Sequence, residues 1–132
     1  MTAAYRSILL AASAVTSIIA QRIHDGIKPR NERLTCIVLK AVSDVPDYHF
    51  EGPSGFGPGR IQVECWAPTK AGAVALAAAA QTALENFTGV SAGISIGWIE
   101  VADKLDIDPI VEEGANVPTE YGVMFDAEYL RI

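Results

Sequence analysis

Residues that commonly bind metals or carry out catalysis are scarce in this sequence. It contains two cysteines, Cys36 and Cys65, and two histidines, His24 and His49, with no CxxC motif and no spacing typical of a zinc site. Neither histidine has a carboxylate or a nucleophile at a recognisable spacing, which argues against acid–base catalysis. We therefore expect no metal, no cofactor and no enzymatic activity. The cysteines are expected to be small buried strand residues, although thiols on adjacent strands could be bridged in a secreted protein.

Positive charge is also limited. Ten Lys and Arg residues stand against sixteen Asp and Glu residues, which gives a formal net charge of -6. Binding to nucleic acid relies on clustered Lys and Arg that displace counterions, so specific binding of DNA is not expected. The segment Gln21 to Arg33 is the most basic part. It is either a solvated connector or a docking surface for an acidic partner, and its charges are Arg22, Lys28, Arg30 and Arg33.

No apolar run is long enough to cross a membrane. The longest, Ile8 to Ala20, is interrupted by Ser13, Thr16 and Ser17. Ala12-Ser13-Ala14 leaves open a signal peptide that is cleaved near Ala14. The spacing of the apolar residues favours instead an amphipathic first helix, capped by Thr2, with a buried face of Tyr5, Ile8, Leu9, Ala12, Val15 and Ile19.

The centre of the chain has the clearest pattern. Prolines and glycines between Gly52 and Gly59 exclude a regular helix or strand there. Arg60 to Ala67 alternates with a period of two and predicts a half-buried strand, in which Ile61, Val63, Cys65 and Ala67 share one face. Pro68 ends this strand and Thr69 can cap a helix over Lys70–Phe87. The apolar stripe of that helix is Ala73, Leu76, Ala80, Leu84 and Phe87.

Three further strands are predicted, over Leu34–Ser43, Ile94–Val101 and Tyr121–Ile132. In Ile94–Val101 we place Trp98 on the face of Ile94 and Ile96. Asp103 to Glu120 is predicted to be a solvated acidic loop. The element order αββαββ then gives one α+β domain over residues 1–132. We expect a two-layer sandwich, in which two helices cover one face of an antiparallel four-stranded sheet.

Gly89-Val90-Ser91-Ala92-Gly93 matches the nucleophile-elbow pattern of hydrolases. That elbow lies between a strand and a following helix, and its histidine comes later in the chain. Here a helix precedes the motif, a strand follows it and both histidines come earlier, so we predict a helix terminus. The Gly-rich loop before Arg60 lacks the Lys-Ser/Thr of a phosphate-binding loop and is predicted to be a turn.

The run from Glu51 to Ala77, EGPSGFGPGRIQVECWAPTKAGAVALA, resembles the central block of the tail completion or tail terminator proteins of long-tailed bacteriophages. Members of this family combine a Gly-rich loop, a strand of the type Arg-x-Gln-x-Asp/Glu-x-Trp/Tyr-Ala, a Thr and a helix rich in Ala and Leu. The similarity extends over most of the chain. Gly72 departs from the pattern, since relatives often have Glu there and can form a capping box.

This resemblance implies a structural virion protein at the head-proximal end of the tail. It implies a homo-oligomeric ring, usually of six copies, that caps the tail tube, meets the tube protein and the head's connector, and lets DNA pass through its lumen without specific binding. We expect partner contacts at charged or aromatic residues on exposed backbone, namely Arg30, Arg33, Tyr48, Phe50, Phe56 and Arg60. The alternative is a small secreted or cytoplasmic α+β domain that binds or hydrolyses a ligand.

Overall fold

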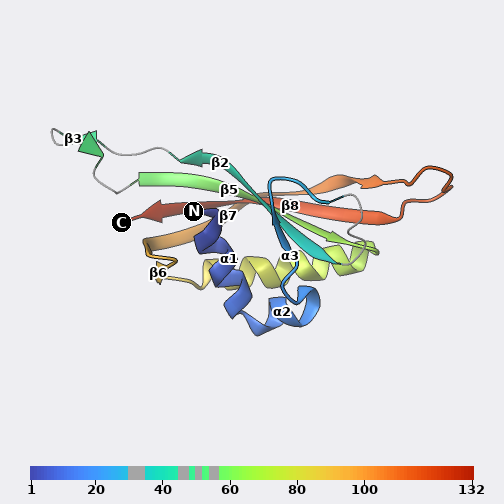
Figure 1. The fold of residues 1–132 in the computed structure, drawn as a ribbon, viewed down its shortest axis with the longest axis horizontal. Coiled ribbons are helices and arrows are strands. Elements are labelled where there is room, and N and C mark those ends of the chain that lie inside the picture. Colours follow the sequence, from blue (N-terminus) through green and yellow to red (C-terminus); the bar gives the residue numbers. More distant parts are fainter. Residues whose placement is uncertain (30–34, 45–47, 50–51, 54–56) are drawn as a thin grey trace.

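One twisted sheet and the helices beneath it make up most of the fold (Figure 1). The computed structural model describes residues 1–29, 35–44, 48–49, 52–53 and 57–132. Within these residues, six strands form a sheet in the order β1-β2-β5-β8-β7-β6. The helices are α1 (Thr2–Ala11), α2 (Ser13–Ile19) and α3 (Lys70–Glu85), and the strands of this sheet are β1 (Ile23–Asp25), β2 (Cys36–Asp44), β5 (Gly57–Ala67), β6 (Gly89–Ser91), β7 (Ile94–Ile110) and β8 (Glu120–Arg131).

The prediction of a four-stranded antiparallel sheet with two helices was wrong. The six-stranded sheet in the described residues is mixed, because β1 pairs in parallel with β2 while the other neighbours are antiparallel. Both additional strands, β1 and β6, have three residues, which is too short to show a periodic pattern in sequence. In addition, β3 (Tyr48–His49) and β4 (Gly52–Pro53) form a small separate hairpin between β2 and β5.

The two central strands confirm the predicted alternation. On β5, Ile61, Val63, Cys65 and Ala67 are buried in the main core, and on β8 Val123, Phe125, Ala127 and Tyr129 lie beside them. All three helices cover this inner face (Figure 1). The core therefore lies between the helical layer and one face of the sheet, as is common where most strand pairs are antiparallel.

The helix over Lys70–Phe87 was also predicted correctly, apart from its last two residues. The Thr69 hydroxyl accepts a hydrogen bond of 3.1 Å from the Gly72 amide at the helix start. Four residues of the predicted stripe, Ala73, Leu76, Ala80 and Leu84, have no exposed surface, whereas Phe87 is half-buried beyond the helix end.

The N-terminal segment forms two helices instead of one. Ala12 is extended (φ -91°, ψ 113°), and the axes of α1 and α2 meet at a bend of 94°. The bend buries both Tyr5 on α1 and Ile19 on α2 in the same core. Thr2 does not cap the first helix, because Met1 occupies the cap position and no side chain bonds there.

Among the described residues, no single helix is long and apolar enough to cross a membrane. The bent pair α1 and α2 meets the length and composition criteria when the two helices are taken together.

Strand β7 is much longer than predicted and contains part of the expected acidic loop. It runs to Ile110 and places Asp103, Asp106 and Asp108 on a strand, where the sequence had predicted a solvated loop. Its pairing with β8 shifts register near Gly97, again between Ala102 and Leu105, and once more before Ile110. Asp103 has a positive φ of 52°, a conformation that Asp tolerates better than most residues. The bulges interrupt the period of two, which is why the sequence did not predict a continuous strand.

The elbow-like motif forms a hairpin, so the predicted helix terminus was wrong. Ala92 and Gly93 both have positive φ values, as a two-residue type I′ turn requires, and they join β6 to β7. The Ser91 hydroxyl is buried and donates a hydrogen bond of 2.8 Å to the Ala4 carbonyl. This serine therefore links β6 to α1.

The two cysteines lie on opposite faces of the sheet. Residue 37 of β2 is directly opposite Cys65 of β5, so Cys36 and Cys65 are neighbours in the sheet, but Cys65 faces the main core and Cys36 faces a smaller cluster on the other side. Side chains that leave a sheet in opposite directions cannot form a disulfide. Both are buried in the thiol form, and burial raises the pKa of the Cys65 thiol.

Replacement of Leu84 by Ala should lower the free energy of unfolding by about 2 to 5 kcal/mol, because it leaves a cavity beneath the sheet. Val74→Ala on the exposed side of the same helix is the matched control and should change stability by less than about 0.5 kcal/mol. Denaturant melting of both variants measures the difference. Equal losses would mean that the stripe does not face the core.

Native protein should resist thiol-specific reagents at both cysteines, and denatured protein should react at both. Rapid labelling of native protein would contradict the assigned burial.

A pKa raised by burial, as for Cys65 and also Tyr5, means that the folded state holds the proton more tightly than the unfolded state does. This contribution to stability is complete below the unfolded pKa and is lost as the pH rises above about 8.5. Melting from neutral to alkaline pH should show this decline in stability.

Candidate assembly surface

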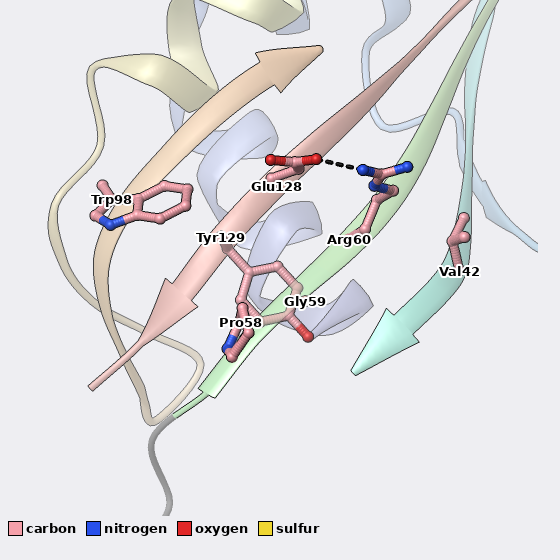
Figure 2. A pocket seen from close by; sticks show the side chains of 7 residues that line it. All are labelled: Val42, Pro58, Gly59, Arg60, Trp98, Glu128 and Tyr129. Carbon is pink, nitrogen blue, oxygen red and sulfur yellow. Dashed lines mark hydrogen bonds and ion pairs between the residues drawn. The ribbon is translucent and has the colours of Figure 1, made fainter. Parts of the chain in front are cut away.

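The face of the sheet opposite the helices, here called the outer face, contains the candidate site. A cavity of about 370 Å³ opens on it where β2, β5, β7 and β8 lie together (Figure 2). We call this cavity the outer-face pocket, and it is lined by Val42, Pro58, Gly59, Arg60, Trp98, Glu128 and Tyr129. These residues combine large apolar side chains with an ion pair.

The floor of the pocket is a close contact between a glycine and an aromatic ring. Gly59 on β5 is directly opposite Tyr129 on β8, and a Cβ at Gly59 would overlap the Tyr129 phenol. The Tyr129 ring then meets Tyr5 of α1 edge-on, with ring centroids 6.0 Å apart. The Tyr5 hydroxyl donates a hydrogen bond of 3.0 Å to the Ala127 carbonyl. This chain of contacts holds α1, β8 and β5 together beneath the pocket.

Two exposed apolar side chains flank the pocket, and each owes its direction to a bulge. Val42 lies at the register shift of β2 and is 54% exposed, while Trp98 follows the shift at Gly97 and is 41% exposed. The bulge places Ile96 and Ile99 together in the core and turns Trp98 to the outer face. The predicted grouping of Trp98 with Ile96 was therefore wrong.

Charged groups lie between these two apolar residues. Arg60 pairs with Glu128 and, at 3.4 Å, with Asp126 (Figure 2 shows the Glu128 pair). The hydrogen bond to Glu128 raises the pKa of Arg60, and the Asp126 and Asp103 carboxylates act in the same direction. Glu100 is exposed and lies opposite Glu128 on β7, so negative charge exceeds positive charge around Arg60.

Further along the outer face, ion pairs surround a small apolar cluster. Cys36, Val38 and Trp66 form this cluster, with Ile107 and Ile110 packed against it. Glu64, which is nearly buried, accepts hydrogen bonds from Gln62 and Trp66 and pairs with Lys40 at 2.7 Å. Lys28 reaches Glu120 at 2.6 Å, and both side chains are more than nine-tenths buried. The charged side chains Glu64 and Glu120 in this part of the outer face thus have partners within the chain. The pocket, in contrast, has the exposed apolar side chains Val42 and Trp98.

Of the six predicted contact residues, the structure describes the side chain of Arg60 alone, and it places Arg60 in the outer-face pocket. Arg30, Arg33, Phe50 and Phe56 lie outside the described residues. Tyr48 lies on β3, for which the backbone is described.

Sequence reasoning missed Trp98, Val42 and Glu128 as parts of the site. Gly97 was a usable signal, because a glycine inside a strand pattern often marks a bulge, and a bulge reverses the face of every later side chain. Val42 offered no such signal. Among the described residues there is no group of three or more His, Cys, Asp or Glu that could hold a metal ion.

Comparison with known proteins gives both a family match and a match to solved folds. The sequence matches the family model described as Tail completion protein gp17 over residues 3–108. Among solved structures, a chain in the "Virion of native gene transfer agent (GTA) particle" aligns with a TM-score of 0.74 at 16% identity, over 99% of this chain and 93% of its own. A second solved structure aligns with a TM-score of 0.56 at 13% identity, over 99% and 92%. No curated protein matches the sequence.

Replacement of Gly59 by Ala should destabilise the fold by about 1 to 3 kcal/mol, because the added methyl group would displace the Tyr129 ring from its place above β5. Gly97→Ala is the control, since a Cβ there meets the flexible Ile132 side chain at 3.2 Å and the cost should be smaller. Thermal melting compares the two variants. An unchanged Gly59→Ala protein would contradict the close contact.

Proposed function

The chain belongs to the Tail completion protein gp17 family, and we propose that it caps the head-proximal end of a phage-type tail tube as a ring. The family match over residues 3–108 carries this proposal, and it confirms the resemblance seen between Glu51 and Ala77. The protein is a structural component of the virion tail. A ring, usually of six copies, would end tube growth and present a surface for joining the head.

The likeness to a chain from a gene transfer agent virion supports the same assignment. It covers nearly the whole of both chains, so this chain shares its fold with a protein that is part of an assembled particle. We infer that this chain also works within such a particle, next to the tube protein on one side and the head's connector on the other.

The outer-face pocket is our candidate for one of these contacts. Trp and Arg are enriched at the energetic centres of protein interfaces, and this pocket presents one of each. Trp98 and Val42 supply exposed apolar surface on two sides of the pocket, and the Arg60–Glu128 pair lies between them. The predicted contact residues Arg30, Arg33, Tyr48, Phe50 and Phe56 remain candidates for further contacts.

DNA would pass through the lumen of the ring without being held. The net charge of -6 supports this, because a protein with net negative charge repels the phosphate backbone and gains little from the release of counterions.

Deletion of the gene in the phage or transfer agent that encodes this chain should give full heads and separate tails that fail to join. Electron microscopy of the lysate and a count of infectious or transducing particles measure this outcome. Normal joined particles after deletion would reject the proposed function.

Within that system, Trp98→Ala combined with Arg60→Glu should reduce the yield of joined particles at least about tenfold, because both side chains line the pocket and are of the types that dominate binding at protein interfaces. Val74→Ser, on the exposed side of α3, is the control and should leave the yield unchanged. Purified double variant should melt as a folded protein. A normal particle yield from it would exclude the pocket as a contact while leaving the ring proposal intact.

A further inference from the structure

The side chains at the outer-face pocket form two rows across β5, β8 and β7. Three apolar residues are neighbours in register across these strands: Pro58, Leu130 and Trp98. Two residues away on each strand, three charged residues are neighbours in the same way: Arg60, Glu128 and Glu100. Residues two apart leave a strand on the same face. An apolar row therefore lies directly beside a charged row.

Glu100 differs from the other members of the charged row. Arg60 pairs with Glu128 and Asp126, whereas Glu100 is exposed and takes part in none of the ion pairs of the described residues. The Cα atom of Glu100 is directly opposite that of Glu128. Like charges in this position destabilise a sheet. A cation from another molecule would relieve this repulsion.

Negative charge exceeds positive charge in this part of the outer face. Within the described residues, one cation stands against four carboxylates here, a net charge of -3: Arg60 against Glu100, Asp103, Asp126 and Glu128. Figure 2 shows Arg60 on the side of Glu128 away from Trp98. Neighbouring strands are about 5 Å apart, so Arg60 on β5 is two strand spacings from Glu100 on β7.

The nearby lysines do not neutralise Glu100. Lys104 of β7 donates a hydrogen bond of 3.2 Å to Gln81 of α3, on the helical side of the sheet. Lys40 pairs with Glu64 at 2.7 Å and so adds no net charge to the outer face. The negative charge at Glu100 is therefore open to a partner.

Trp98 provides an aromatic surface beside this charge. Its side chain is 41% exposed and lies on the same face of β7 as Glu100, about 7 Å along the strand. The face of an indole ring attracts cations, most often the guanidinium group of arginine. This group is planar and can stack on a ring while its N–H groups donate to a carboxylate, which the compact ammonium group of lysine does less well.

We propose that the outer-face pocket binds an arginine side chain of a partner protein, with the guanidinium group against the Trp98 ring and in an ion pair with Glu100. This inference rests on the proposed function and names the chemistry of the partner at that contact. An apolar side chain next to the arginine would lie on Pro58 and Leu130. An acidic side chain in the same place would be repelled, so the pocket discriminates between partners by charge.

Reversal of the charge at Glu100 tests the proposal in the phage or transfer agent that encodes this chain. Glu100→Lys should reduce the yield of joined particles at least about tenfold, because the arginine of the partner would then meet a like charge. Asp108→Lys makes the same change in charge at another exposed position of β7, outside the pocket, and is the matched control. Its yield should equal that of wild type.

Glu100→Gln separates binding from folding. It removes one of two opposed carboxylates, so the purified variant should melt at the wild-type temperature or above it. The yield of joined particles should nevertheless fall about threefold or more, because the ion pair with the partner is lost. A loss of yield accompanied by an equal loss of stability would show a structural role for Glu100 and overturn the proposal.

Selection for restored particles from Glu100→Lys identifies the partner. We expect second-site changes in another structural gene of the particle that replace an arginine by a neutral or acidic residue. Suppressors confined to the gene for this chain would mean that a second copy occupies the pocket, and would overturn the proposal. If Glu100→Lys protein fails to melt as a folded protein, selection from Glu100→Gln replaces it.

A normal particle yield from Glu100→Lys, or an equal loss from Asp108→Lys, would also overturn the inference. Neither result affects the proposed function, which the gene-deletion phenotype tests without reference to Glu100. Normal joined particles after deletion would reject the function itself, so the two failures are distinguishable.

Discussion

The helices bury one face of the sheet, whereas the other face is formed by side chains of the strands themselves. On the inner face, the central strands β5 and β8 contribute an apolar residue at every second position, and α1, α2 and α3 cover them. On the outer face, the same strands must satisfy their side chains by ion pairs such as Lys40–Glu64 and Arg60–Glu128, or by contact with another protein. The division between the core and the candidate assembly surface follows from this one-sided cover.

The contact of Tyr5, Tyr129 and Gly59 joins the two sides. Tyr129 belongs to the buried core, yet its ring extends over Gly59 and forms the floor of the outer-face pocket. A helix at the start of the chain thus supports a surface built from its centre and its end. Binding at the pocket would therefore act on residues that are held firmly by the core, which is the arrangement that favours a defined interface.

The long, irregular strand β7 shapes both the outer face and one margin of the sheet. Its bulges turn Trp98 outward and interrupt the edge, while Asp103, Lys104 and Asp108 remain exposed along it. A strand with these features is protected from uncontrolled pairing with other strands but open to side-chain contacts. A component of a virion tail needs both properties, because it must stay soluble before assembly and bind specific neighbours afterwards.

The sequence alone determined the elements with strong local patterns. The alternation in Arg60–Ala67, the Thr69 cap and the Leu84 stripe were predicted correctly, because period and capping depend on neighbours in the chain. The run from Glu51 to Ala77 was also enough to suggest the family. Arg60 was the one predicted contact residue whose side chain the structure describes, and it lies in the pocket.

Tertiary structure decided everything that depends on distant partners. The three-residue strands β1 and β6 exist because β2 and β7 offer them backbone partners, and the bend at Ala12 serves a core that the local sequence does not specify. One extra residue at Gly97 moved Trp98 from the predicted core face to the outer face. A bulge reverses every side chain beyond it, and only the pairing of whole strands determines where it falls.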